Sequence, residues 1–160
     1  MKNNIKNKDK ISFKIKTITK NKKAYFDYEI LKTYEAWIEL KWSEVKALKT
    51  WNSNLKWSHI IFNNDELYIT WMHISAYKFN SQEILATDRD RKMLLHKKTI
   101  IMLIHKLKEK WVSIIPTKIY LKNNLIKIEV ALAKWRKQYD KRNLLKTRDV
   151  KMKELLHYKI

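Results

Sequence analysis

The sequence predicts a mainly β fold, a small antiparallel barrel with one long helix and one or more short helices. Several runs of residues alternate apolar with polar side chains or are rich in aromatic and β-branched types, and both patterns are typical of strands. Two pairs of such runs are joined by triplets rich in Asn, which favour hairpin turns. One long segment has apolar residues at helical spacing. Sheets of short antiparallel strands commonly close into barrels, so a barrel is expected.

The elements follow one another without an internal repeat. A first strand is indicated from residue 11, where Ile11, Phe13 and Ile15 alternate with polar residues. The long helix carries one apolar stripe, for which core packing is the ordinary interpretation. The other expected elements are strands in 25–31 and 34–40, a short helix at 43–50, a strand pair at 55–62 and 66–74, a loop at 79–92, the long helix at 96–110, and a strand pair at 112–121 and 125–133.

The positive charge is concentrated at the two ends of the chain. The formal net charge is +20, of which residues 1–23 carry +8 and residues 134–160 carry +7, so the 110 residues between them hold only +5. We therefore expect a basic arm at 1–19, a barrel at 20–133 and a basic tail at 134–160. A charge of this size favours binding to a polyanion through counterion release, and nucleic acid is the leading candidate partner.

The composition disfavours several other classes of protein. The longest run free of Asp, Glu, Lys and Arg has eleven residues, which cannot span a bilayer, and the charged N-terminus lacks the apolar core of a secretory signal. The chain has no cysteine, which fits a reducing cytoplasm. Its five histidines lack the i, i+4 spacing of helical metal ligands, and no phosphate-binding loop is present. We expect no membrane partner, metal, cofactor or catalytic residue, and hence no enzyme.

Two basic clusters are the strongest candidates for contact with RNA. Arg89-Asp90-Arg91-Lys92 precedes an apolar run, and the cluster at 134–142 leads from the last expected strand into the tail. Guanidinium and ammonium groups pair with phosphate, and a tyrosine such as Tyr139 stacks on unpaired bases. An isolated cluster is more often a solvated charge run, but here two clusters and a basic arm occur together.

Residues 131–142 combine small residues, a basic run and an Asp-Lys-Arg triplet in the order Ala-Leu-Ala-Lys-Trp-Arg-Lys-Gln-Tyr-Asp-Lys-Arg. This segment resembles the small protein B (SmpB) family, the bacterial partners of transfer-messenger RNA (tmRNA), in which A-K-G, basic residues and D-K-R stand here. The resemblance covers about residues 20–142 and includes five more blocks in family order, at 21–24, 34–37, 42–48, 71–75 and 91–97.

The resemblance implies an RNA-binding adaptor of trans-translation, the rescue of ribosomes stalled on messages without a stop codon. In the family an OB-type barrel binds the tRNA-like domain of tmRNA, and a C-terminal tail enters the vacant messenger channel of the 30S subunit and becomes helical there. A monomeric, cytoplasmic protein is expected. The alternative is a general single-strand or ribosomal RNA-binding OB-fold protein without a rescue role, and a nuclease is disfavoured.

The resemblance also implies two sets of site residues. The set expected near the tRNA-like domain is Asn21, Lys22, Lys23, Glu35, Arg89, Arg91 and Lys92. Within it, Glu35 is expected to order neighbouring donors rather than to do chemistry. The set expected at the decoding centre and along the messenger channel is Lys134, Arg136, Lys137, Tyr139, Asp140, Lys141, Arg142, Lys146, Arg148, Lys151 and Lys153.

The chain contains seven tryptophans and no glycine. At the usual glycine content, an absence over this length has a probability on the order of 10⁻⁵. Trp51 and Trp111 each follow an expected helix, where the backbone commonly turns left-handed and glycine is preferred. We hypothesise that UGA codons read as glycine in the host are translated here as tryptophan, and we leave all seven tryptophans out of the RNA-binding set. Family glycine positions are occupied by Trp37, Trp42, Trp51, Trp71, Trp111 and Trp135.

Overall fold

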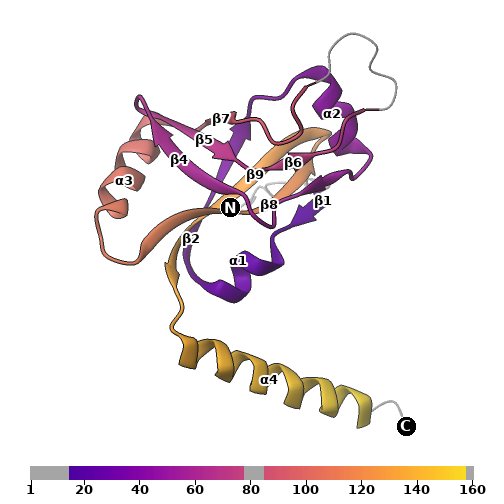
Figure 1. Ribbon diagram of the computed structural model, residues 1–160, viewed down its shortest axis with the longest axis vertical. Coiled ribbons are helices and arrows are strands. Elements are labelled where there is room, and N and C mark those ends of the chain that lie inside the picture. Colours follow the sequence, from indigo (N-terminus) through magenta and orange to yellow (C-terminus); the bar gives the residue numbers. More distant parts are fainter. Residues whose placement is uncertain (1–14, 78–84, 158–160) are drawn as a thin grey trace, which may run out of the picture.

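A curved antiparallel sheet forms the body of the protein in the computed structural model, which describes residues 15–77 and 85–157 (Figure 1). Its seven strands lie in the order β1-β8-β9-β2-β7-β5-β4, and β3 and β6 form a separate two-stranded sheet. The elements are β1 (Ile15–Lys20), α1 (Lys22–Asp27), β2 (Tyr28–Ile38), α2 (Trp42–Lys49), β3 (Ser53–Asn54), β4 (His59–Asn63), β5 (Glu66–Thr70), β6 (His73–Ile74), β7 (Arg91–Leu94), α3 (Lys97–Leu107), β8 (Val112–Lys122), β9 (Leu125–Trp135) and α4 (Gln138–His157).

The mainly β, antiparallel fold is confirmed. Both hairpins predicted from Asn-rich triplets are present, as β4–β5 and β8–β9. Asn64, Asp65, Asn123 and Asn124 have positive φ in the two turns, a conformation that Asn and Asp tolerate well. Among the described residues the hydrogen-bonded ladder leaves β1 and β4 at its edges, while β4 also packs against β8, so the sheet curls into an open barrel.

The structure differs from the two strands expected between residues 25 and 40. Residues 25–31 are expected to hold strand, but Tyr25 and Phe26 lie in α1, a short helix capped at its N-terminus by Asn21. The Asn21 side chain accepts a hydrogen bond from the Ala24 amide at 3.0 Å, which satisfies an otherwise unpaired donor of the first turn. The two separate strands expected up to residue 40 are the single strand β2. Of the strand expected from residue 11, residues 11–14 lie outside the described residues.

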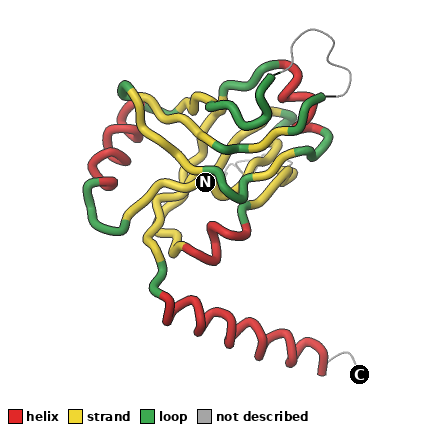
Figure 2. Tube along the Cα trace, viewed as in Figure 1, coloured by secondary structure: helices red, strands yellow, loops and turns green. Residues whose placement is uncertain are grey.

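The core lies between the inner face of the sheet and the helices that cover its openings (Figure 2). The α3 helix forms as expected from its apolar spacing, but it is a peripheral helix in which Leu103 is the buried residue. Leu107, from the same stripe, remains exposed. Within the described residues, no helix is both long enough and apolar enough to cross a membrane.

Three tryptophans have left-handed backbones. The φ angles of Trp51, Trp71 and Trp111 are 67°, 56° and 70°. The left-handed turns predicted at Trp51 and Trp111, after α2 and α3, are therefore confirmed, and Trp71 adds a third in the bend after β5. Such a φ is a true outlier for a bulky residue and is free of cost for glycine.

Candidate RNA-binding surface

Glu35 is held in a defined position by three donors. It projects from β2 toward β8 and β9, where the Tyr120 hydroxyl donates to Glu35 Oε2 at 2.6 Å and Lys127 Nζ donates to Oε1. Lys122 Nζ lies 3.1 Å from Oε2. The hydrogen bonds, first from Lys127 and then from Tyr120, lower the pKa of Glu35 to about 2. Burial and the bond to this carboxylate raise the pKa of Tyr120.

An open hollow of about 440 Å³ lies beside Glu35. Its lining is partly apolar, from Leu94 and Leu95, and partly polar, from Thr99 and Lys127. The carboxylate thus fixes Lys127 at the edge of a shallow cavity and remains partly exposed itself. An ordered cation beside a partly apolar hollow suits a phosphate next to a base or ribose.

Asn21 and its two neighbouring lysines serve different purposes. The Asn21 side chain is buried and also donates to the Pro116 carbonyl at 3.1 Å, so both ends of its amide are used by the fold. Lys22 is exposed, and Lys23 places its Nζ 3.6 Å from the centre of the Trp57 ring. Asn21 is thus engaged by the fold at the start of α1, while the two lysines lie nearer the surface.

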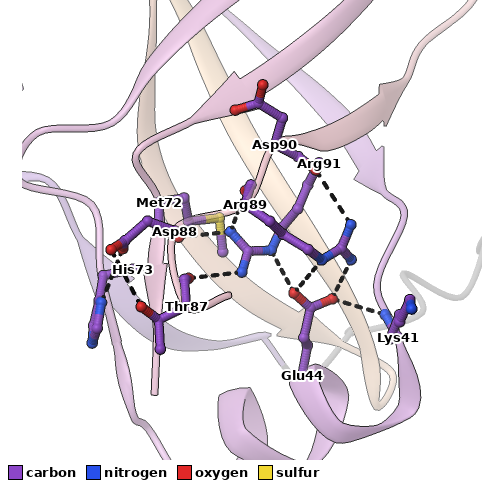
Figure 3. A network of polar contacts seen from close by, with 9 residues as sticks. All are labelled: Lys41, Glu44, Met72, His73, Thr87, Asp88, Arg89, Asp90 and Arg91. Atoms are coloured by element: carbon purple, nitrogen blue, oxygen red, sulfur yellow. Dashed lines mark hydrogen bonds and ion pairs between the residues drawn. The ribbon is translucent and has the colours of Figure 1, made fainter. Parts of the chain in front are cut away.

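The basic cluster Arg89-Asp90-Arg91-Lys92, which follows the first expected hairpin, takes part in a network of contacts within the protein (Figure 3). Arg91 is 1% exposed and lies in β7, not in the expected loop. Its Nε donates to Glu44 Oε1 at 2.7 Å, and its Nη atoms donate to the carbonyls of Met72, Arg89 and Thr87. A guanidinium so enclosed stabilises the fold and has no free donor edge for RNA in this conformation.

Glu44 is the centre of that network. Its carboxylate accepts from Arg89 Nε at 2.9 Å, from Arg91 and from the Lys41 amide at 2.8 Å, the last as part of the N-terminal cap of α2. Burial opposes its ionisation, but the bonds from Arg89 and the Lys41 amide outweigh that effect and lower the pKa of Glu44. Sequence reasoning missed this residue. The available signal was a glutamate in the first turn of the helix expected at 43–50.

The remaining residues of the cluster are more accessible. Arg89 keeps a quarter of its side chain exposed while bound to Glu44. Lys92 Nζ lies 2.5 Å from Glu66 on the outer face of the sheet, and this pairing raises the pKa of Lys92. These two side chains are still placed to meet a polyanion, which could exchange with their carboxylate partners.

The tail begins with two residues bound to the barrel and continues as an exposed helix. Arg136 donates from Nε to the Tyr28 carbonyl at 3.0 Å, and Lys141 Nζ lies 2.7 Å from Asp27 Oδ1. Beyond them α4 extends away from the sheet (Figure 1). The other predicted tail residues are exposed: Lys134, Lys137, Tyr139, Asp140, Arg142, Lys146, Arg148, Lys151 and Lys153.

The histidines and acidic residues of the described ranges, 15–77 and 85–157, are not grouped as metal ligands would be. His73 is paired with Asp88 at 2.9 Å on the surface, and His59 with Thr70 at 2.9 Å. The arrangement as a whole can bind and orient a polyanion.

A family model described as SmpB protein matches residues 18–159, nearly the entire chain. The chain belongs to the SmpB family. This SmpB-family chain is 44% identical over 143 residues to the SsrA-binding protein of Mycoplasma mycoides subsp. mycoides SC, which covers 89% of the chain and 97% of that relative. It is 46% identical to the SsrA-binding protein of Persephonella marina over 91% of the chain and 95% of the relative.

A solved structure is also similar to this SmpB-family chain. The structure is described as "tmRNA-SmpB: a journey to the center of the bacterial ribosome", and its matching chain is 36% identical with a TM-score of 0.63. The match covers 75% of this chain and 85% of the other.

Proposed function

We propose that this protein binds the tRNA-like domain of tmRNA and brings it to stalled ribosomes, where its tail occupies the empty messenger channel. The observation that carries the proposal is the division of the molecule into a barrel with ordered surface cations and a basic helix, α4, that lies almost wholly exposed. SsrA-binding relatives of nearly full length and the similarity to a tmRNA–SmpB structure support it.

The barrel would bind RNA by shape and phosphate contacts. Glu35 pairs with Lys127 at the hollow beside Leu94 and with Lys122 next to it, and Lys22 and Lys23 extend the basic surface from α1. Each of these lysines neutralises a phosphate and releases counterions, so affinity depends on salt. None of them is required to transfer a proton or to form a bond, which agrees with an adaptor rather than an enzyme.

The tail would bind in the messenger channel only when no message occupies it. Residues 134–160 carry ten basic and three acidic residues, so the helix is attracted to ribosomal RNA along its length. A channel filled by message excludes the helix sterically, and an empty channel accepts it. The exposed Tyr139 stands at the start of this segment and can stack on a base of the decoding centre.

Two measurements test the proposal. The intact protein should bind tmRNA more tightly than bulk tRNA at the same salt concentration, and equal affinities would contradict tmRNA recognition. A chain ending at residue 137 should keep tmRNA binding and lose the tagging of nascent peptides on stalled ribosomes. Retained tagging by the shortened chain would exclude the role of the tail. An intact protein with neither tmRNA preference nor tagging activity would leave the general RNA-binding alternative.

A further inference from the structure

The direction of α4 relative to the barrel depends on very few contacts. Every residue from 142 to 156 is exposed, including Leu144, Leu155 and Leu156. A helix without a packed face receives no orientation from the hydrophobic core. Its direction is therefore determined where it leaves the barrel, between Trp135 and the first turn of the helix.

At that junction the tail is attached at two points to the end of α1. The Arg136 amide donates to the Asp27 carbonyl at 3.0 Å, and the Asp27 carboxylate receives Lys141 Nζ at 2.7 Å. The side chains of Lys141 and Asp27 are only 13% and 12% exposed, so water screens this ion pair less than a surface pair. One attachment precedes the helix and the other lies within its first turn, so together they fix its direction.

We propose that Asp27 is a positioning residue for the tail, and that its ion pair with Lys141 holds α4 in a set direction away from the barrel. This rests on the proposed function, in which the helix must enter a narrow channel. A helix already aligned loses less orientational freedom on entry than one that swings freely. Lys141 would then act in the free protein through Asp27, before any contact with ribosomal RNA.

The test measures direction without RNA. Because the chain has no cysteine, cysteines introduced at the exposed positions Lys49 and Lys153 give two unique spin-label sites. The distance distribution between the labels should be narrow in the parent and should broaden in Asp27→Asn and Lys141→Gln. Lys146→Gln, on the exposed part of α4, is the matched control and should leave the distribution narrow.

The conservative variant Asp27→Glu should restore a narrow distribution and rescue peptide tagging, whereas Asp27→Asn should reduce tagging while tmRNA affinity stays unchanged. Identical distributions in the parent, Asp27→Asn and Lys141→Gln would overturn the proposal. Because Lys141 lies outside the barrel, its variant remains informative even if Asp27→Asn unfolds. Equal affinity for tmRNA and bulk tRNA would contradict the proposed function, but the label distances would still report on the role of Asp27 in orienting α4.

The backbone angles carry a second, independent inference. All seven tryptophans are exposed, between 42% and 69%. Among the described residues, positive φ occurs only at Asn, Asp and three of these tryptophans. Asn and Asp are the residue types that adopt this conformation readily, apart from glycine. Tryptophan is the exception, in a chain without any glycine.

We infer that the protein in its native host carries glycine at positions 51, 71 and 111, because UGA is decoded there as glycine. Intact-mass and peptide-mass measurement of the protein purified from that host tests this. Peptides containing positions 51, 71 and 111 should be lighter by the difference between tryptophan and glycine. Tryptophan masses at these three positions would overturn the inference.

Discussion

Replacing Trp71 and Trp111 together with glycine is expected to stabilise the fold. Both residues have left-handed φ, and their side chains are 66% and 69% exposed, so little packing is lost. A Cβ in this conformation costs roughly 1–2 kcal/mol per residue, so the two substitutions relieve about 2–4 kcal/mol. Glycine also gives the unfolded chain more freedom, which costs about 0.4–1 kcal/mol per site. The expected net gain is about 1–2 kcal/mol.

Thermal unfolding followed by circular dichroism measures the effect. For a chain of this length the gain corresponds to a rise in Tm of roughly 2–8 °C. The matched control replaces Trp42 and Trp57, each 63% exposed and without positive φ, by glycine. That control should lose stability, since glycine weakens the first turn of α2 and no strain is relieved. A lower Tm for the first double variant, or equal shifts in both, would refute the reasoning.

Three further outcomes are expected. Glu44→Gln leaves Arg91 buried without its counter-charge and should lower the free energy of unfolding in urea by about 3–5 kcal/mol. The control Glu66→Gln, at the more exposed pair with Lys92, should lower it by less than about 1 kcal/mol. Equal losses of stability in the two variants would contradict the role of Glu44. The pKa of Glu35 falls from 4.5 to about 2 on folding, so its carboxylate contributes stability that is complete above about pH 4.5 and lost as the pH falls to 2. Glu35→Gln should therefore flatten the dependence of stability on pH in that window, and an unchanged slope would exclude the network around Glu35. Lys22→Gln should weaken tmRNA binding and reduce the log–log salt slope by about 0.7–0.9, and an unaltered slope would remove Lys22 from the interface.

The hairpins could be predicted because their signal is local. Asn64 and Asn123 lie within the turns that they form, and the flanking strands pair with residues only a few positions away. The helix α1 was missed for the opposite reason. Its aromatic residues favour strand, and the cap that stabilises it depends on Asn21 bonding to Pro116 on a distant strand.

The partners of charged side chains could not be predicted. Arg91 stands in a basic cluster in the sequence, and its counter-charge Glu44 lies 47 residues earlier. The spacing of charges along a chain indicates a binding surface only if each charge faces solvent. Glu35 was assigned its ordering role from the resemblance, but its donors Tyr120 and Lys127 became apparent only when β2, β8 and β9 were brought together.

The strand order has a consequence for synthesis of the protein. The edge strand β1 pairs with β8, and β2 pairs with β9. These pairings of the first two strands can therefore form only after the last two strands of the barrel have been synthesised. At translation rates of roughly 5–20 residues per second, about 5–20 s pass between the emergence of β1 and that of its partner. During this interval β1 and β2 have unpaired backbone edges. The barrel can close only after β9, the last strand before α4, has been synthesised, so its folding is confined to the end of translation.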